Sequence, residues 1–172
     1  MRKIELIFGT VAAISIVYKF ILGSELNPLF IMSITGLSVF YTYFSIAYFN
    51  NIHFIKILKK ESYRGISTWR IFGTIGLGFG LGITTLGILW SLMYWPFNTF
   101  YPLRIPILFI IGLISIIKFS TTRSNDYKSI ITRILIIGGL GIILWVTPQE
   151  TLNELLGIEM NEMAEVKQKE IK

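Results

Sequence analysis

The sequence predicts an all-α membrane protein, a polytopic transmembrane helical bundle of about five spans arranged as two hairpins and one further helix. Of its 172 residues, 53% are hydrophobic and only 15% are charged. The mean hydropathy of +0.65 exceeds that of water-soluble domains of this size. Five apolar runs approach the length that crosses a bilayer, at residues 6–22, 29–49, 71–95, 105–119 and 130–146. Residues 1–146 are therefore expected to form one transmembrane domain.

The first three runs are long, and the charge within them is confined to Lys19, near the end of the first run. Arg2 and Lys3 precede that run as they would in a signal peptide. However, Lys19 would then lie inside the apolar core, and no Ala-x-Ala cleavage site follows. We therefore interpret the first run as a membrane helix.

The fourth and fifth runs are shorter, and Arg104, Lys118 and Arg133 lie at their edges. Two interpretations are open for them. They form two complete crossings whose edge cations snorkel to the headgroups, or they form a re-entrant pair. We expect two complete crossings.

Residues 147–172 are expected to form an acidic tail outside the membrane. Thr147-Pro148-Gln149-Glu150 has the pattern of a capping box with proline at the first helical position. An amphipathic helix is predicted to start there, weakened at Gly157, with an apolar stripe of Leu152, Leu155, Leu156, Met163 and Val166.

The distribution of basic residues predicts the orientation. Eleven of them flank the runs on one side of a five-span topology: Arg2, Lys3, Lys56, Lys59, Lys60, Arg64, Arg70, Lys118, Arg123, Lys128 and Arg133. The opposite loops contain Arg104 alone, and the tail has six glutamates against three lysines. Since short basic loops stay in the cytoplasm, we expect a cytoplasmic N-terminus and a periplasmic C-terminus. The four alanines and the excess of Ile, Phe, Tyr, Asn and Lys are typical of a low-GC bacterium, which places the protein in the bacterial inner (cytoplasmic) membrane.

The segment 50–70 mixes apolar residues with Lys56, Lys59, Lys60 and Arg64. This mixture indicates that the second helix continues into a basic interfacial segment that binds anionic lipids. A solvated positive loop and a regulatory docking segment are the other interpretations. His53 has no second ligand nearby and is assigned no site. No nucleic-acid partner is expected, because the basic residues lie between apolar runs and do not gather on one face.

Glycines predict where helices pack closely. Gly76, Gly78, Gly80 and Gly82 form small-xxx-small pairs in the third run, and Gly138 and Gly139 give the fifth run a thin face. A phosphate-binding loop is excluded as their explanation, because the glycines lie deep within an apolar run without a preceding strand.

The residue inventory favours a non-catalytic protein without cofactor or metal. The chain has no cysteine, one histidine and no carboxylate within an apolar run. Lys19 is the candidate intramembrane charge site, and it either snorkels to the headgroups or meets a buried partner in an ion pathway. Tyr94 and Trp95, beside Pro96, are predicted to form an interfacial aromatic belt.

Two hairpins share a loose internal repeat, which begins with Phe8-Gly9-Thr10 in the first and Phe72-Gly73-Thr74 in the second. Gly36-Leu37 and Gly112-Leu113 lie in the returning helices. Because both hairpins start on the same side, they would be parallel repeats, in contrast to the inverted repeats of many transporters.

The hairpins also resemble the N-terminal membrane region of the gliding motility protein GldL and similar small Bacteroidetes membrane proteins. In that family the first helix ends in a glycine, an apolar pair, a lysine and a His-Trp-Pro-Gly turn. Here Gly87 to Pro96 keeps the Trp95-Pro96 pair, with Ser91 and Tyr94 in place of the lysine and histidine, whereas the first hairpin keeps Lys19. The resemblance covers roughly residues 4–119.

The resemblance implies association with the proton-driven motor of gliding and type IX secretion, in which a glutamate of the second helix works with the lysine. The run 29–49 contains no Glu or Asp. We therefore expect an accessory or scaffold subunit that packs against other membrane proteins or against itself. The alternative is a component of an ion- or proton-coupled motor or transporter that uses Lys19.

Overall fold

The computed structural model describes residues 2–22, 28–93, 105–123, 125–148 and 151–152. Within these ranges the regular structure is all helical, so the predicted helical bundle is confirmed. The α-helices are α1 (Arg2–Leu22), α2 (Pro28–Phe49), α3 (Thr68–Leu92), α4 (Ile105–Thr122), α5 (Asn125–Arg133) and α6 (Gly139–Val146). Two 3-10 turns, η1 (Phe54–Lys56) and η2 (Lys60–Tyr63), follow α2, and a π-helical turn, η4 (Ile134–Gly138), joins α5 to α6.

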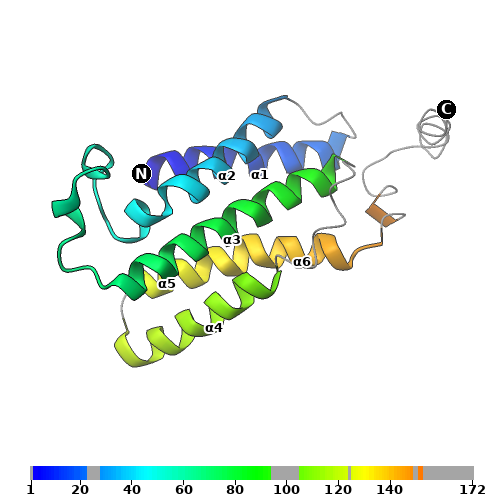
Figure 1. Cartoon of the computed structure of the whole chain (residues 1–172). Helices are drawn as coiled ribbons and strands as arrows, with labels where there is room; N and C mark the ends of the chain where they lie inside the picture. Colours follow the sequence, from blue (N-terminus) through cyan, green and yellow to red (C-terminus); the bar gives the residue numbers. More distant parts are fainter. Residues whose placement is uncertain (1, 23–27, 94–104, 124, 149–150, 153–172) are drawn as a thin grey trace, which may run out of the picture.

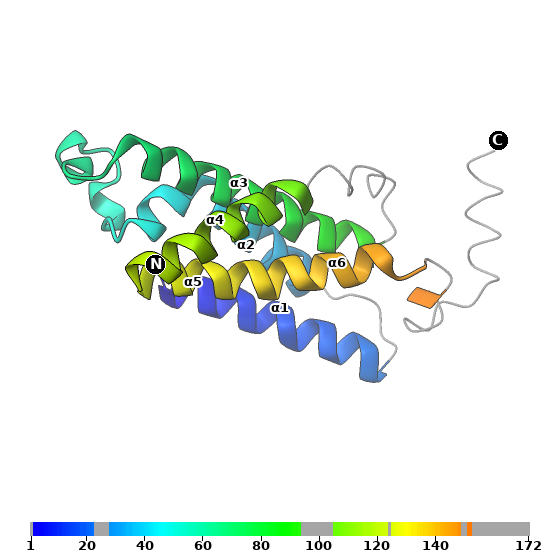
Figure 2. The same cartoon turned by 90° about the horizontal axis from the view of Figure 1, so that it is seen from below.

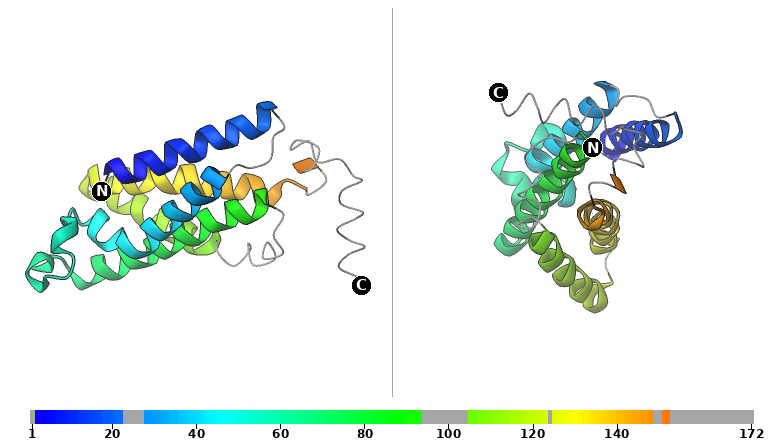
Figure 3. Two further views of the ribbon diagram at one scale, coloured as in Figure 1. Left: turned by 90° about the horizontal axis from the view of Figure 1, so that it is seen from above. Right: turned by 90° about the vertical axis from the view of Figure 1, so that its right-hand side faces the viewer.

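The helices lie side by side, with α5, η4 and α6 forming one continuous rod (Figure 1). The N-terminus, the η1–η2 turns and the α4–α5 junction lie together at one end of the bundle (Figure 2). We call this the basic end, because these segments carry Lys3, Lys56, Lys59, Lys60, Arg64 and Arg123. Seen along the bundle, α1 and α4 flank the α5–α6 rod (Figure 3). The α2–α3 contact is the most extensive one between helices.

Three helical stretches are long and apolar enough to cross a membrane: Pro28–Phe49, Thr68–Leu92 and Asn125–Val146. A shorter apolar helix covers Leu108–Thr121. These helices identify the chain as a membrane protein. Among the residues searched, α1 is not in this set, so the crossing at 6–22 stays a prediction.

Small residues allow α2 and α3 to touch. A β-carbon at Gly78 would overlap the Ser45 side chain, and one at Gly82 would overlap Oγ1 of Thr42. The Ser38 hydroxyl donates a hydrogen bond of 2.8 Å to the carbonyl oxygen of Gly82 in the facing helix. Backbone approach of this kind is how helices associate where the surrounding lipid is as apolar as their side chains.

A second glycine contact attaches α1 to α2. A β-carbon at Gly36 would lie 2.8 Å from Cε1 of Phe8. Phe30 of α2 and Leu77 and Leu81 of α3 are fully buried and belong to the core that continues from this contact. The core therefore extends from α1 through α2 to α3.

The expected continuation of α2 into the basic segment is wrong, because α2 ends at Phe49. Asn51 adopts a left-handed conformation with φ of +55°, a frequent way to end a helix. The Ile52 amide then donates back to the carbonyl oxygen of Ala47 at 2.8 Å, and the Asn50 side-chain amide satisfies another terminal carbonyl. Lys56 and Lys60 consequently lie in separate 3-10 turns.

The structure describes only the first two residues of the predicted capping box, Thr147 and Pro148, so the box stays a prediction. Thr147 is the C-cap of α6, where the backbone turns extended, and its hydroxyl donates to the carbonyl oxygen of Ile143 at 2.7 Å. The Leu152 amide donates a hydrogen bond of 3.0 Å to the carbonyl oxygen of Pro148. Gln149, Glu150 and the predicted amphipathic helix beyond Leu152 lie outside the described residues.

The glycine contact between α2 and α3 is testable by a single added methyl group. We expect Gly78→Ala to lower the free energy of unfolding by about 1–3 kcal/mol, because the methyl group forces the helices apart. The measurement is equilibrium unfolding in mixed micelles. Gly9→Ala in α1 is the matched control, since a β-carbon there meets no atom within 4 Å. Equal stability of the two variants would contradict close packing at Gly78.

Candidate functional site

A largely buried ion pair joins Glu5 of α1 to Arg133, the last residue of α5. Arg133 Nε lies 2.5 Å from Glu5 Oε1, and Nη2 lies 2.6 Å from Oε2. The Arg133 and Glu5 side chains are only 17% and 14% exposed. The planar guanidinium therefore contacts the carboxylate through two parallel hydrogen bonds, the geometry that arginine provides and lysine does not.

Two tyrosines of α2 complete the cluster. Tyr41 Oη donates to Glu5 Oε1 at 2.6 Å, and Tyr48 Oη donates to Oε2. Each carboxylate oxygen thus accepts two hydrogen bonds, which fills the acceptor capacity of the group. Arg133 also donates through Nη1 to the carbonyl oxygen of Ser129 at 2.8 Å. The carboxylate is locked in place by α2 and α5, and this arrangement is typical of a structural ion pair.

A second polar cluster holds the turn between α2 and α3. Arg70, near the start of α3, donates to the Phe49 carbonyl oxygen at 3.3 Å and to Asn50 Oδ1 at 2.9 Å. Its Nη2 also lies 2.8 Å from Asp126 Oδ2 of α5. Arg70 therefore caps the C-terminus of α2 and connects it to α5. Because the Arg70 and Asp126 side chains are 39% and 38% exposed, their charge attraction contributes little to stability.

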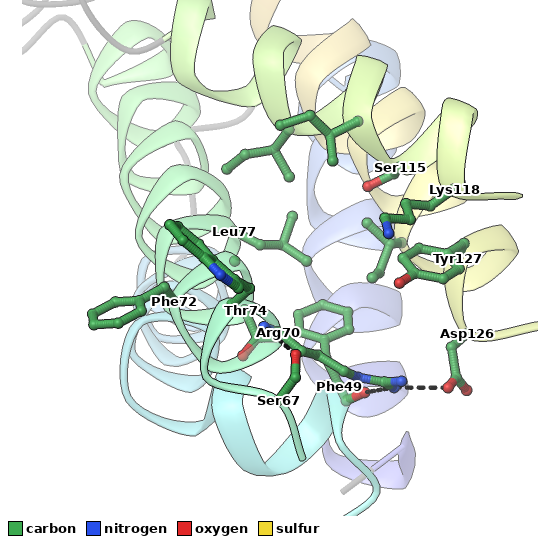
Figure 4. Close-up of a pocket in the computed structure, with 15 residues that line it drawn as sticks. Phe49, Ser67, Arg70, Phe72, Thr74, Leu77, Ser115, Lys118, Asp126 and Tyr127 are labelled. Carbon is green, nitrogen blue, oxygen red and sulfur yellow. Dashed lines mark hydrogen bonds and ion pairs between the residues drawn. The ribbon is translucent and has the colours of Figure 1, made fainter.

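A groove of about 390 Å³ opens between α3 and α4 near the basic end. Arg70 and Asp126 lie at one end of it, and Ser115 and Lys118 of α4 line the side facing α3 (Figure 4). Its apolar lining includes Leu77, Ile111 and Ile114. The volume is in the range of ligand-binding sites.

The glycines singled out in the sequence lie on different faces. Gly78 and Gly82 contact α2, whereas a β-carbon at Gly76 would lie 3.7 Å from Ile111 Cδ1 of α4. Gly80 is buried. A β-carbon at Gly138 would lie 3.7 Å from Leu108 Cδ1, and one at Gly139 would meet no atom within 4 Å. The third helix therefore uses its glycines toward two neighbours.

The other predicted site residues are less fully described. Lys19 belongs to α1, but its side chain is not described. Tyr94 and Trp95 lie outside the described residues, so the aromatic belt stays a prediction. Lys56, Lys59, Lys60 and Arg64 are exposed at the basic end. No group of three or more His, Asp or Glu residues capable of holding a metal was found in the described part of the chain.

Sequence reasoning missed the Glu5–Arg133 pair. Glu5 immediately precedes the first apolar run, and Arg133 lies at the edge of the fifth run as one of the basic residues that predict the orientation. One signal was available: Tyr41 and Tyr48 are seven residues apart and so share one face of a helix. Even so, periodicity does not say which distant charge those hydroxyls meet.

Comparison with protein-family models, curated proteins and solved structures found no match to this chain. The resemblance to the GldL membrane region therefore depends on the hairpin motifs alone.

The ion pair is testable by removing one partner and then both. We expect Glu5→Leu to lower the free energy of unfolding by about 3–5 kcal/mol, because it leaves the Arg133 charge buried without its partner. Glu5→Leu with Arg133→Met should regain most of that loss, since a buried ion pair replaced by apolar residues is often near neutral in stability.

Unfolding in mixed micelles measures both variants. Glu61→Gln is the control, because Glu61 is exposed in η2. A double variant as unstable as Glu5→Leu would contradict the pairing.

Proposed function

We propose that this protein is a non-catalytic integral protein of the bacterial inner membrane, an accessory or scaffold subunit that packs against other membrane proteins or a second copy of itself. The observation that carries the proposal is the contrast between a pair of interior charges that satisfy each other and the apolar outer faces of the bundle. Glu5 and Arg133 neutralise each other, with hydrogen bonds to Tyr41 and Tyr48. Neither group is then available as an acid or a base.

The buried hydroxyls of α3 support the same conclusion. Thr84 donates to the Gly80 carbonyl oxygen at 2.8 Å, and Thr85 donates to the Leu81 carbonyl oxygen at 2.7 Å. Both hydroxyls are therefore bonded within their own helix. A transport path needs polar groups that face a common channel, and these two do not provide one.

The outer faces of α1 and α4 are the surfaces offered to partners or lipid. Large apolar side chains on them are exposed: Leu6, Ile7, Ile14, Val17 and Ile21 of α1, and Phe109, Ile110, Leu113, Ile116 and Ile117 of α4. Because α1 and α4 flank the α5–α6 rod, the two faces lie far apart on the bundle (Figure 3). A scaffold with two separate faces can hold two neighbours.

The basic end is proposed to be cytoplasmic, with the N-terminus inside and the C-terminus in the periplasm. The basic residues of η1, η2 and the α4–α5 junction gather there, in accord with the positive-inside rule. Anionic lipids are the proposed partners of Lys56, Lys59, Lys60 and Arg64, which are exposed at the basic end.

The alternative is a component of a GldL-like ion- or proton-coupled motor or transporter, which would use Lys19. Lys19 and Glu5 are fourteen residues apart in one continuous helix. This spacing corresponds to about 21 Å along the axis, so Glu5 is not the counter-charge of Lys19. The motor function would thus need an acid supplied by a partner subunit.

Photo-crosslinking tests the scaffold function. We expect benzoylphenylalanine at Ile14 of α1 or Ile117 of α4 to yield protein adducts in intact membranes, because both side chains are exposed on the proposed faces. The measurement is the adduct mass and its identification by mass spectrometry. Glu61, exposed at the basic end, is the control position. Lipid adducts alone at both faces would contradict the scaffold function.

Lys19→Met separates the scaffold from the motor. In the scaffold the variant keeps the adducts, because the apolar stem remains and a charge unfavourable in hydrocarbon is lost. Loss of the adducts from inserted, monodisperse protein would favour the motor instead.

Reporter fusions test the orientation. A reporter active only in the periplasm should be active when fused after Lys172, and a cytoplasmic reporter should be active when inserted after Ser62, between the basic residues of the η1–η2 turns. Cytoplasmic activity after Lys172 would contradict the odd number of crossings.

A further inference from the structure

We infer that the groove between α3 and α4 is a binding site for one anionic phospholipid of the leaflet at the basic end. This site is separate from the exposed lysines of η1 and η2, and it does not depend on the scaffold function. Three features of the groove carry the inference: a positive charge and a buried hydroxyl that both lack a partner within the described part of the chain, and an apolar wall beside them.

The charge belongs to Lys118. Arg70 and Asp126 at the groove mouth form an ion pair of 2.8 Å and largely cancel each other. Lys118 lines the groove and has no ion-pair partner within the part of the chain that the structure describes. Its amine is directed toward the groove (Figure 4). The groove therefore carries a net positive charge at the basic end, complementary to a lipid phosphate.

The hydroxyl belongs to Ser115, one turn deeper in α4. Ser115 is only 4% exposed, yet its hydroxyl makes no hydrogen bond to another described residue. A serine in a helix often bonds to its own backbone, and a buried hydroxyl left without a partner costs free energy. Figure 4 shows this hydroxyl directed into the groove. A ligand acceptor placed there, such as the ester carbonyl of a phospholipid, would satisfy it.

The order of these groups along α4 matches the order of groups in a phospholipid. Lys118, Ser115 and Ile111 follow one another toward the middle of the helix. They span seven residues, or about 10 Å. Phosphate, ester and acyl chain succeed each other in the same way from headgroup to bilayer centre. Leu77 and Ile114 continue the apolar wall along which an acyl chain would lie.

Trp69, at the start of α3, is the type of residue expected beside the headgroup of the same lipid. Trp69 lines the groove mouth and is 86% exposed. Tryptophan is enriched where membrane meets water, because its ring is apolar and its N–H is polar. Trp69 and Lys118 thus mark the interface on the two sides of the groove.

The test is lipid binding to the full-length protein in detergent, followed by native mass spectrometry. We expect one phosphatidylglycerol to bind in preference to phosphatidylcholine, and Lys118→Gln to weaken phosphatidylglycerol binding about fivefold through loss of one charge. Ser115→Ala should weaken the binding of both lipids about two- to fivefold, because both lipids contain the ester. Lys128→Gln is the matched control, since Lys128 is exposed on α5 and does not line the groove.

Four results of the lipid-binding measurement would contradict the proposed site. Equal affinity of the two lipids for the wild-type protein, or unchanged affinity in Lys118→Gln, would overturn the site. Weakening by Lys56→Gln equal to that by Lys118→Gln would also overturn it, because the lipid would then bind the surface segment. Competition by inorganic phosphate at equal concentration would show that the apolar wall contributes nothing, and would likewise contradict a phospholipid site.

A second measurement identifies the occupant in the membrane. Benzoylphenylalanine in place of Ile114, on the apolar wall, should yield an adduct with the mass of a phospholipid. A protein adduct at that position, whether from a second copy or another chain, would show that a helix fills the groove and would overturn the inference.

Discussion

The arrangement of the helices depends on keeping one carboxylate and one guanidinium together inside the bundle. Glu5 and Arg133 are 128 residues apart in the sequence, and their pairing brings the first helix to the last rod. Neither charge is stable alone in an apolar setting, so each position is tolerated only because the other is occupied. The two tyrosines of α2 fill the remaining acceptor positions of the carboxylate. The pair therefore sets how α1, α2 and α5 meet, and the apolar contacts pack around that junction.

The α2–α3 pair is held by a different physical effect. In a bilayer the lipid is as apolar as the helices, so association depends on close packing and hydrogen bonds. Gly78 and Gly82 remove the side chains that would keep the backbones apart, and the Ser38 hydroxyl bridges the helices directly. Arg70 secures the same pair at the basic end by capping α2. The α2–α3 pair therefore has the most extensive contact between helices in the bundle.

Helix α4 is packed differently, and that difference creates the groove. A β-carbon at Gly76 would lie at ordinary van der Waals distance from Ile111 of α4. In contrast, a β-carbon at Gly78 or Gly82 would overlap atoms of α2, so that contact requires glycine. The space left between α3 and α4 contains Ser115 and Lys118, which no part of the described chain satisfies. Close packing on one face of α3 and looser packing on the other thus separate a structural contact from a surface suited to a ligand.

The fold class follows from the amino-acid sequence. The chain has long apolar runs and lacks strand signals and long polar stretches. Backbone groups in hydrocarbon must form hydrogen bonds, and a helix forms them within itself, so these runs predict a helical membrane bundle. Local patterns are less reliable at helix ends, because a single backbone conformation decides where a helix stops: Asn51, with its positive φ, follows the end of α2 and precedes the basic turns. The tertiary structure alone decided the Glu5–Arg133 pair, the partners of each glycine and the polar lining of the groove. Hydropathy and periodicity report which face of a helix is apolar, but the pairing of distant charges depends on how the helices are rotated against each other.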